Sequence, residues 1–89
     1  MSRRIRQNWT PLTDGQLRQR VRARIESGIL PAKHPSAQWA GPGVGKPCVV
    51  CDRATHWDEI EHELDFGDGT PRTFHRACMD AWEAERADG

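Results

Sequence analysis

Apolar side chains recur every four residues near the start of the chain. Leu17, Val21 and Ile25 form this series, and a four-residue spacing places them along one face of a helix. Arginines occupy the flanking positions. The pattern therefore predicts an amphipathic, basic helix over about residues 14–27.

Residues at both ends of this segment are typical of helix boundaries. Thr13 and Gln16 match a capping box, in which each side chain accepts a hydrogen bond from the backbone N–H of the other residue. Gly28 and Pro31 follow the last apolar position and favour termination. The helical segment is expected within residues 13–30.

The next segment, residues 31–47, contains four prolines and three glycines. This composition disfavours both helix and sheet, so we predict a loop. Its one large aromatic residue is Trp39. We expect the indole ring to dock on the protein and to hold part of the loop in place. The alternative is a mobile tether with an exposed tryptophan.

Apolar and acidic residues alternate between positions 59 and 66, which is the period of a half-buried strand. One face would carry Ile60, His62, Leu64 and Phe66, and the other Glu59, Glu61, Glu63 and Asp65. Residues 67–71, GDGTP, have turn chemistry, and residues 72–74 resume a strand. We predict a β-hairpin.

Helical spacing returns in the segment HRACMDAWEAER, residues 75–86. Cys78 and Met79 lie four and three positions before Trp82, which places the three side chains on one helix face. A short helix is expected to follow the hairpin.

The net charge of the 89 residues is zero, but the charge is unevenly distributed. Residues 1–30 carry +5, residues 31–51 carry +2 and residues 52–89 carry −7. The basic part begins with residues 1–12, which we expect to form a flexible arm. The total charge predicts neither a nucleic-acid binder nor a membrane-surface protein, whereas the distribution predicts two oppositely charged surfaces.

Two absences bear on location and partners. The sequence contains neither a run of 18 apolar residues nor an apolar segment near its start, which argues against a membrane span and a secretory signal. We expect a cytoplasmic protein without a membrane partner. Its three cysteines are then better explained by metal binding or thiol reactivity than by a disulfide framework.

The cysteines and one histidine form two pairs with metal-ligand spacing. Cys48 and Cys51 have two residues between them, as do His75 and Cys78. Residues in such a pair converge on one ion, and zinc takes four sulfur or nitrogen ligands tetrahedrally. We predict a Cys₃His zinc site. Four protein ligands leave no open position, so the zinc would be structural rather than catalytic.

Three thiolates, a neutral imidazole and Zn²⁺ sum to a charge of −1. Arg53 and Arg76 each lie one or two positions from a ligand, and we expect them to offset this charge from outside the coordination shell.

Other interpretations of these residues have less support. A redox Cys-x-x-Cys pair favours a βαβ context, and an iron–sulfur cluster usually takes four cysteines. His62 could replace His75 as a ligand but lacks the paired spacing. The segment AGPGVGKP, residues 40–47, is close to a phosphate-binding loop, but Pro47 supplies neither the hydroxyl nor the N–H that the loop needs.

A Cys-x-x-Cys knuckle, a hairpin and a helix whose first turn supplies the last ligands resemble the treble-clef zinc fingers. The resemblance covers residues 48–87 and implies a small α+β fold, with the amphipathic helix preceding the zinc module. The motifs around Trp39 and Trp82, together with the ligand pairs, are also similar to a group of small uncharacterised bacterial proteins. Neither resemblance implies an activity, since treble clefs serve many functions.

Arg18, Arg20, Arg22 and Arg24 could contact phosphates along one face of the first helix, or form an ordinary solvated face. The acidic strand face could pair with these arginines or be solvated. No nucleophile lies near an unligated histidine in a recognisable motif, so we do not expect an enzyme. The sequence favours a protein-binding adaptor or regulator with an unidentified partner, and the alternative is a nucleic-acid-binding protein. It leaves the oligomeric state open.

Overall fold

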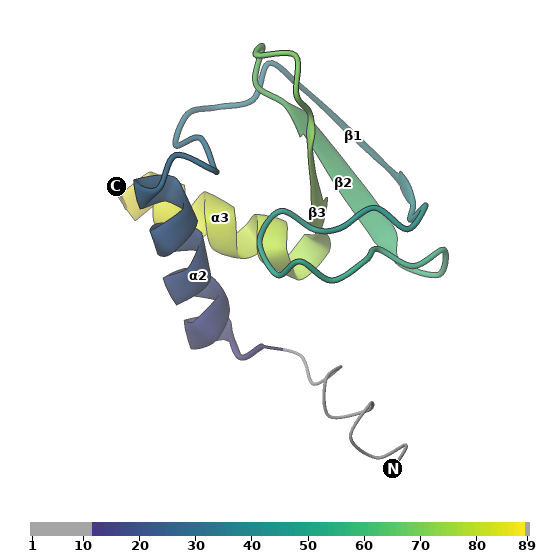
Figure 1. The fold of residues 1–89 in the computed structure, drawn as a ribbon, viewed down its shortest axis with the longest axis horizontal. Helices are drawn as coiled ribbons and strands as arrows, with labels where there is room; N and C mark the ends of the chain where they lie inside the picture. Colours follow the sequence, from purple (N-terminus) through teal and green to yellow (C-terminus); the bar gives the residue numbers. More distant parts are fainter. Residues whose placement is uncertain (1–11, 89) are drawn as a thin grey trace.

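A computed structural model describes residues 12–88 of the chain, which form a small α+β fold (Figure 1). In this described part, two helices accompany one antiparallel sheet of strand order β1-β2-β3. The elements are α2 (Asp14–Glu26), β1 (Ala37–Pro42), β2 (Ile60–Asp65), β3 (Arg72–His75) and α3 (Arg76–Asp88). The predicted small α+β class, first helix, hairpin and last helix are confirmed.

The first helix begins where the capping box predicted. The Thr13 hydroxyl accepts a hydrogen bond from the Gln16 N–H at 3.1 Å, and the Gln16 side chain accepts one from the Thr13 N–H at 2.9 Å. The helix ends at a Ser27 cap, and Gly28 follows with a φ of +84°. Such a φ is unstrained in glycine because glycine has no Cβ.

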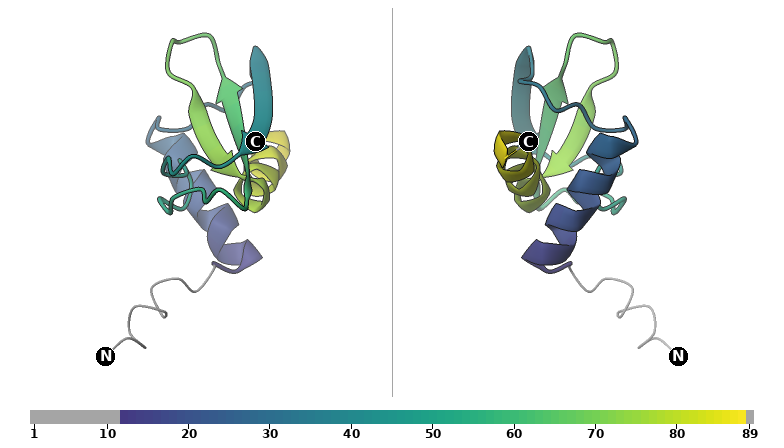
Figure 2. Two further views of the ribbon diagram at one scale, coloured as in Figure 1. Left: turned by 90° about the vertical axis from the view of Figure 1, so that its right-hand side faces the viewer. Right: turned by 90° about the vertical axis from the view of Figure 1, so that its left-hand side faces the viewer.

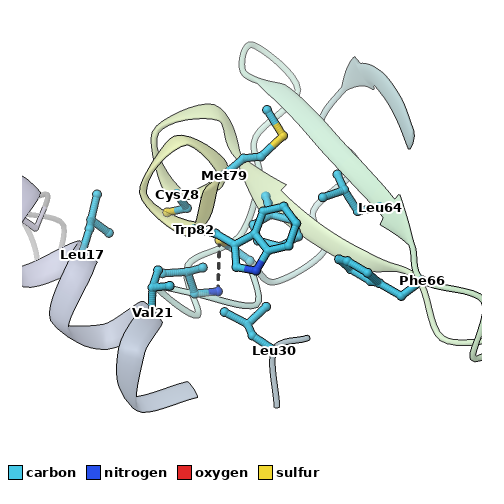
Figure 3. Packing of buried hydrophobic residues seen from close by; sticks show 11 residues of the cluster. Leu17, Val21, Leu30, Leu64, Phe66, Cys78, Met79 and Trp82 are labelled. Atoms are coloured by element: carbon cyan, nitrogen blue, oxygen red, sulfur yellow. Dashed lines mark hydrogen bonds between the residues drawn. The ribbon is translucent and has the colours of Figure 1, made fainter. Parts of the chain in front are cut away.

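The core lies between the two helices and the sheet (Figures 2 and 3). Trp82 of α3 is at its centre, with ring centroids 5.6 Å from both Phe66 and Phe74. The indole N–H donates to the Pro31 carbonyl at 2.8 Å, so the buried ring leaves no polar atom without a partner. Trp82 therefore connects the segment after α2 to the sheet.

The first helix is part of this core. Leu17 and Val21 are buried, and Ile25 is partly buried against the same cluster. Beside this apolar contact, Glu85 of α3 accepts ion pairs from Arg18 and from Arg22, the latter at 3.0 Å. The suggestion that the acidic strand face pairs with these arginines is thus not what the structure shows.

The segment 31–47, predicted as a loop, contains strand β1. Its backbone pairs with β2 in the register Trp39↔Glu63 and Gly41↔Glu61. The Trp39 ring is 55% exposed, so the expectation that it docks is wrong. The segment is ordered by backbone hydrogen bonds rather than by a buried ring. Amino-acid composition alone does not reveal such strand pairing.

The two faces of β2 also depart from simple alternation. Leu64 and Phe66 are buried as predicted, but Ile60 is 55% exposed and Glu61 only 9% exposed. Helix α3 covers one face, whereas residues 43–56 cover the other, where the Thr55 hydroxyl donates to Glu61 at 2.9 Å. The second face of β2 is covered by polar groups of residues 43–56 rather than by solvent. Their hydrogen bonds explain why the Glu61 carboxylate can be buried.

We predict that Gly43→Ala destabilises the protein by about 1–3 kcal/mol, because overpacking a rigid site has that cost. A Cβ at this position would lie 2.2 Å from the backbone oxygen of His56. Gly41→Ala is the control, since no atom lies within 4 Å of its Cβ position. Urea unfolding of the metal-loaded protein measures both, and equal stabilities of the two variants would contradict the prediction.

Candidate metal centre

Cys48 and Cys51 lie in a tight turn closed by a β-bridge between Pro47 and Ala54. The Cys48 N–H donates to the Arg53 carbonyl at 2.8 Å, and its carbonyl accepts from the Asp52 N–H at 2.9 Å. Asp52 has a φ of +67°, a left-handed conformation that aspartate tolerates better than most residues. This turn directs both thiols to the same side.

The second pair lies at the junction of β3 and α3. His75 is the last residue of the strand, and Cys78 is in the first turn of the helix. The ligand atoms of His75, Cys78, Cys48 and Cys51 all lie within 4.8 Å of one another. The four residues predicted as ligands therefore form one cluster that can hold a metal ion.

The distances in the cluster fit a tetrahedral ion. The Cys51 and Cys78 sulfurs lie 3.3 Å and 4.0 Å from Nδ1 of His75. Metal–ligand bonds of ordinary length to a tetrahedral zinc would separate sulfur from nitrogen by about 3.6 Å. An ion at the centre would need only small side-chain adjustments.

The ring orientation of His75 assigns its ligand atom. Nε2 lies 3.1 Å from the Ala54 carbonyl and 3.5 Å from a carboxylate oxygen of Glu59. A carbonyl oxygen can only accept, so Nε2 carries the proton and the Nδ1 lone pair faces the three sulfurs. Metal-ligating histidines are commonly oriented by such a second hydrogen bond.

The thiols strongly perturb one another. Hydrogen bonds from Cys51 and Cys78 lower the pKa of Cys48, and the Val50 N–H also points at its sulfur, at 3.4 Å. The pKa of Cys78 is raised, first by its hydrogen bond to Cys48, and that of Cys51 is raised for the same reason. Three thiolates this close together require a cation.

Arg53 and Arg76 lie where the charge argument placed them, beside the cluster. Both line a cavity of about 560 Å³ that also reaches Cys51, His75 and Cys78, of which Cys51 is the least buried. Arg53 is 4.0 Å from Glu59, and Arg76 contacts Asp80 at 3.2 Å. That they offset the charge of a metal-bound cluster stays a prediction.

His62, the alternative ligand, is not part of the cluster. It neighbours Phe74 in the sheet, whereas His75 neighbours Glu61. Adjacent residues of a strand point to opposite faces, so His62 lies on the face covered by α3 and His75 on the other. The two-residue spacing between His75 and Cys78 therefore identified the correct histidine.

The four arginines of α2 contact acidic groups of this chain. Arg18 and Arg22 pair with Glu85, and Arg20 and Arg24 approach Asp52 at 3.5 Å and 2.8 Å. Arg24 also donates to the Val49 carbonyl at 2.9 Å. The predicted phosphate-contacting residues are therefore arranged as internal ion pairs.

Asp52 and Glu85 are the two residues that sequence reasoning missed. A helical signal for Glu85 existed, since it lies three positions after Trp82 and so near the buried face of α3. Asp52 directly follows the second cysteine of the knuckle. This position could have singled it out, because a turn residue with positive φ is commonly glycine, asparagine or aspartate.

Comparison of the chain with protein-family models, curated proteins and solved structures finds no match. Neither helix within residues 12–88 has the length and apolar character needed to cross a bilayer. The metal centre thus rests on the geometry described above.

We predict that His75 binds zinc through Nδ1. In the zinc-loaded protein, long-range ¹H–¹⁵N correlation spectra should show a protonated Nε2 and a metal-shifted Nδ1 for His75. His62 is the internal control, and neither of its ring nitrogens should show a metal shift, because it lies outside the cluster. A protonated Nδ1 on His75 would contradict the assigned tautomer.

Proposed function

We propose that the protein is a structural zinc module of the treble-clef type that serves as a protein-binding adaptor or regulator. The observation that carries the proposal is the convergence of the four predicted ligands in one cluster. Three cysteines and one histidine are the donor set that zinc favours, and four protein ligands make a closed site. Zinc would supply folding energy and charge neutralisation rather than bond-making chemistry.

The order of parts supports the treble-clef assignment. A knuckle between Pro47 and Ala54 supplies two ligands, an antiparallel hairpin follows, and the strand–helix junction supplies the other two. Here the sheet has a third strand, β1, which the resemblance did not imply.

Exposed apolar side chains support the adaptor role. Trp57 is 82% exposed and Val44 69%, in a chain with only 36% hydrophobic residues. Together with Ile60 they come from segments that meet at one end of the sheet, where the Gly43 N–H donates to the Glu59 carbonyl at 3.0 Å. Grouped apolar side chains on a small surface are typical of protein-binding sites.

The contacts of α2 favour the adaptor over the nucleic-acid alternative. Phosphate binding by this helix would compete with the contacts that its arginines make to Glu85 and Asp52. Glu85 is buried, so withdrawing an arginine from it would leave a buried carboxylate with less compensation.

The zinc claim predicts metal-dependent folding. Chelation should unfold residues 48–86, because metal binding supplies on the order of 10 kcal/mol in zinc-finger peptides. His75→Asn should lower zinc affinity by more than about 100-fold, since even outer partners of ligands are typically worth 10–100-fold. The measurements are metal analysis by mass spectrometry and circular dichroism during chelator titration.

His62→Asn is the matched control and should retain one zinc per chain, because His62 lies outside the cluster. A metal-free protein that stays folded, or equal zinc content in the two histidine variants, would overturn the structural zinc site.

The proposed protein-binding role predicts that the protein has little affinity for nucleic acid. Titration of the zinc-loaded protein with DNA and RNA at about 50 mM salt should give no micromolar binding, because the α2 arginines are paired internally. Micromolar binding that weakens steeply with added salt would instead establish the nucleic-acid alternative. Capture of a protein partner that Trp57→Lys abolishes, with zinc content unchanged, would support the adaptor.

A further inference from the structure

The two edges of the sheet differ in how they are covered. At the β3 edge, the Val49 N–H donates to the Thr73 carbonyl at 2.8 Å, so the knuckle occupies that side. Strand β1 forms the other edge and pairs only with β2 (Figure 1). No contact between α3 and β1 is present in the described part of the chain. Among residues 12–88, nothing therefore covers the outer side of β1.

The register shows which backbone groups point outward. The Gly43 N–H donates to the Glu59 carbonyl, and in an antiparallel pair every second residue exchanges hydrogen bonds with its neighbour. The backbone N–H and carbonyl groups of Trp39 and Gly41 thus point toward β2. The N–H and carbonyl groups of Gln38 and Ala40 point away from the sheet, and within residues 12–88 they have no hydrogen-bond partner.

The composition of β1 leaves this edge unprotected. Residues 37–42, AQWAGP, contain no charged side chain, although 29% of the whole chain is charged. Natural edge strands commonly carry charges that prevent pairing with another strand. The central residue is instead Trp39, whose ring is more than half exposed.

We propose that β1 pairs antiparallel with β1 of a second copy of this chain, centred on Trp39. In this register the N–H of Gln38 donates to the carbonyl of Ala40 in the second copy, and the N–H of Ala40 donates to the carbonyl of Gln38. Twofold symmetry repeats both bonds, so four hydrogen bonds satisfy all the outward groups of the two residues. The two sheets become one six-stranded sheet.

Neighbouring registers can form as many hydrogen bonds but leave the carbonyl group of Gln38 or of Ala40 without a partner. Centring on Ala40 places Gln38 opposite Pro42, which has no N–H to donate. Centring on Gln38 places Ala40 opposite Ser36, whose N–H already donates to the Asp65 carbonyl at 2.7 Å. The Trp39 register is therefore the one that pairs both backbone groups of Gln38 and of Ala40, and a second copy supplies the complementary groups at matching positions.

The Trp39 register also pairs the two indole rings. Trp39 would face itself at a position without hydrogen bonds, where antiparallel strands approach to about 4.5 Å between Cα atoms. Directly opposite aromatic side chains at such positions stabilise a strand pair. No like charges meet, because the strand has no charged residue.

The test is sedimentation equilibrium of the zinc-loaded full chain, up to a concentration of about 100 μM. The wild type should sediment with twice the 10.1 kDa mass of one chain. Trp39→Lys should raise the dimer dissociation constant about tenfold or more, because it places two like charges opposite each other. Trp57→Lys removes another exposed tryptophan outside the strand and should dimerise like the wild type.

Ala40→Pro provides a second variant, because it removes an outward N–H while leaving the hydrogen bonds to β2 intact. Unchanged zinc content would show that each variant is folded. A monomeric wild type at the highest concentration, dimerisation of Trp39→Lys at wild-type strength, or equal loss in Trp57→Lys would overturn the proposal. In mixed-labelled samples, isotope-filtered contacts between Gln38 and Ala40 of different copies would establish the register.

Discussion

The convergence of three thiols and one imidazole in a space less than 5 Å across is the constraint on which the rest of the structure depends. The knuckle and the β3–α3 junction are distant in sequence, yet their ligand atoms are mutual neighbours. Without a cation, the pKa shifts of Cys48 and Cys78 run in opposite directions because the thiols cannot all ionise together. A bound metal would relieve this conflict and fix the hairpin between its two ends.

A second set of interactions joins α2 to the metal-binding half. Glu85 and Asp52 each accept two arginines of the helix, and Leu17 and Val21 bury the apolar stripe between these ion pairs. Four arginines of the basic half are thus paired with two carboxylates of the acidic half. Asp52 belongs to both sets, because its backbone shapes the knuckle while its carboxylate receives Arg20 and Arg24.

Local signals in the sequence predicted most of the elements and the whole ligand set. The capping box at Thr13, the period of α2 and the two ligand pairs depend on residues a few positions apart, so one sequence suffices to recognise them. Strand β1 could not be recognised in this way, because its stability comes from pairing with residues 18 to 28 positions later, from Pro42↔Ile60 to Ala37↔Asp65. The burial of Glu61 likewise depends on the N–H of Val44, 17 residues earlier, together with the Thr55 hydroxyl.

The position of Trp82 has a consequence for the order of events during synthesis. The ring contacts Phe66 and Phe74 and donates to Pro31, 51 residues earlier, and Glu85 reaches Arg18 across 67 residues. Cys78, the last ligand, is also supplied by α3. A ribosome must therefore release residues 76–86 before the earlier segments can acquire their native neighbours. Until then the nascent chain exposes its thiols and apolar residues, so folding is expected to be concerted once residues 76–86 have emerged, rather than stepwise from the N-terminus.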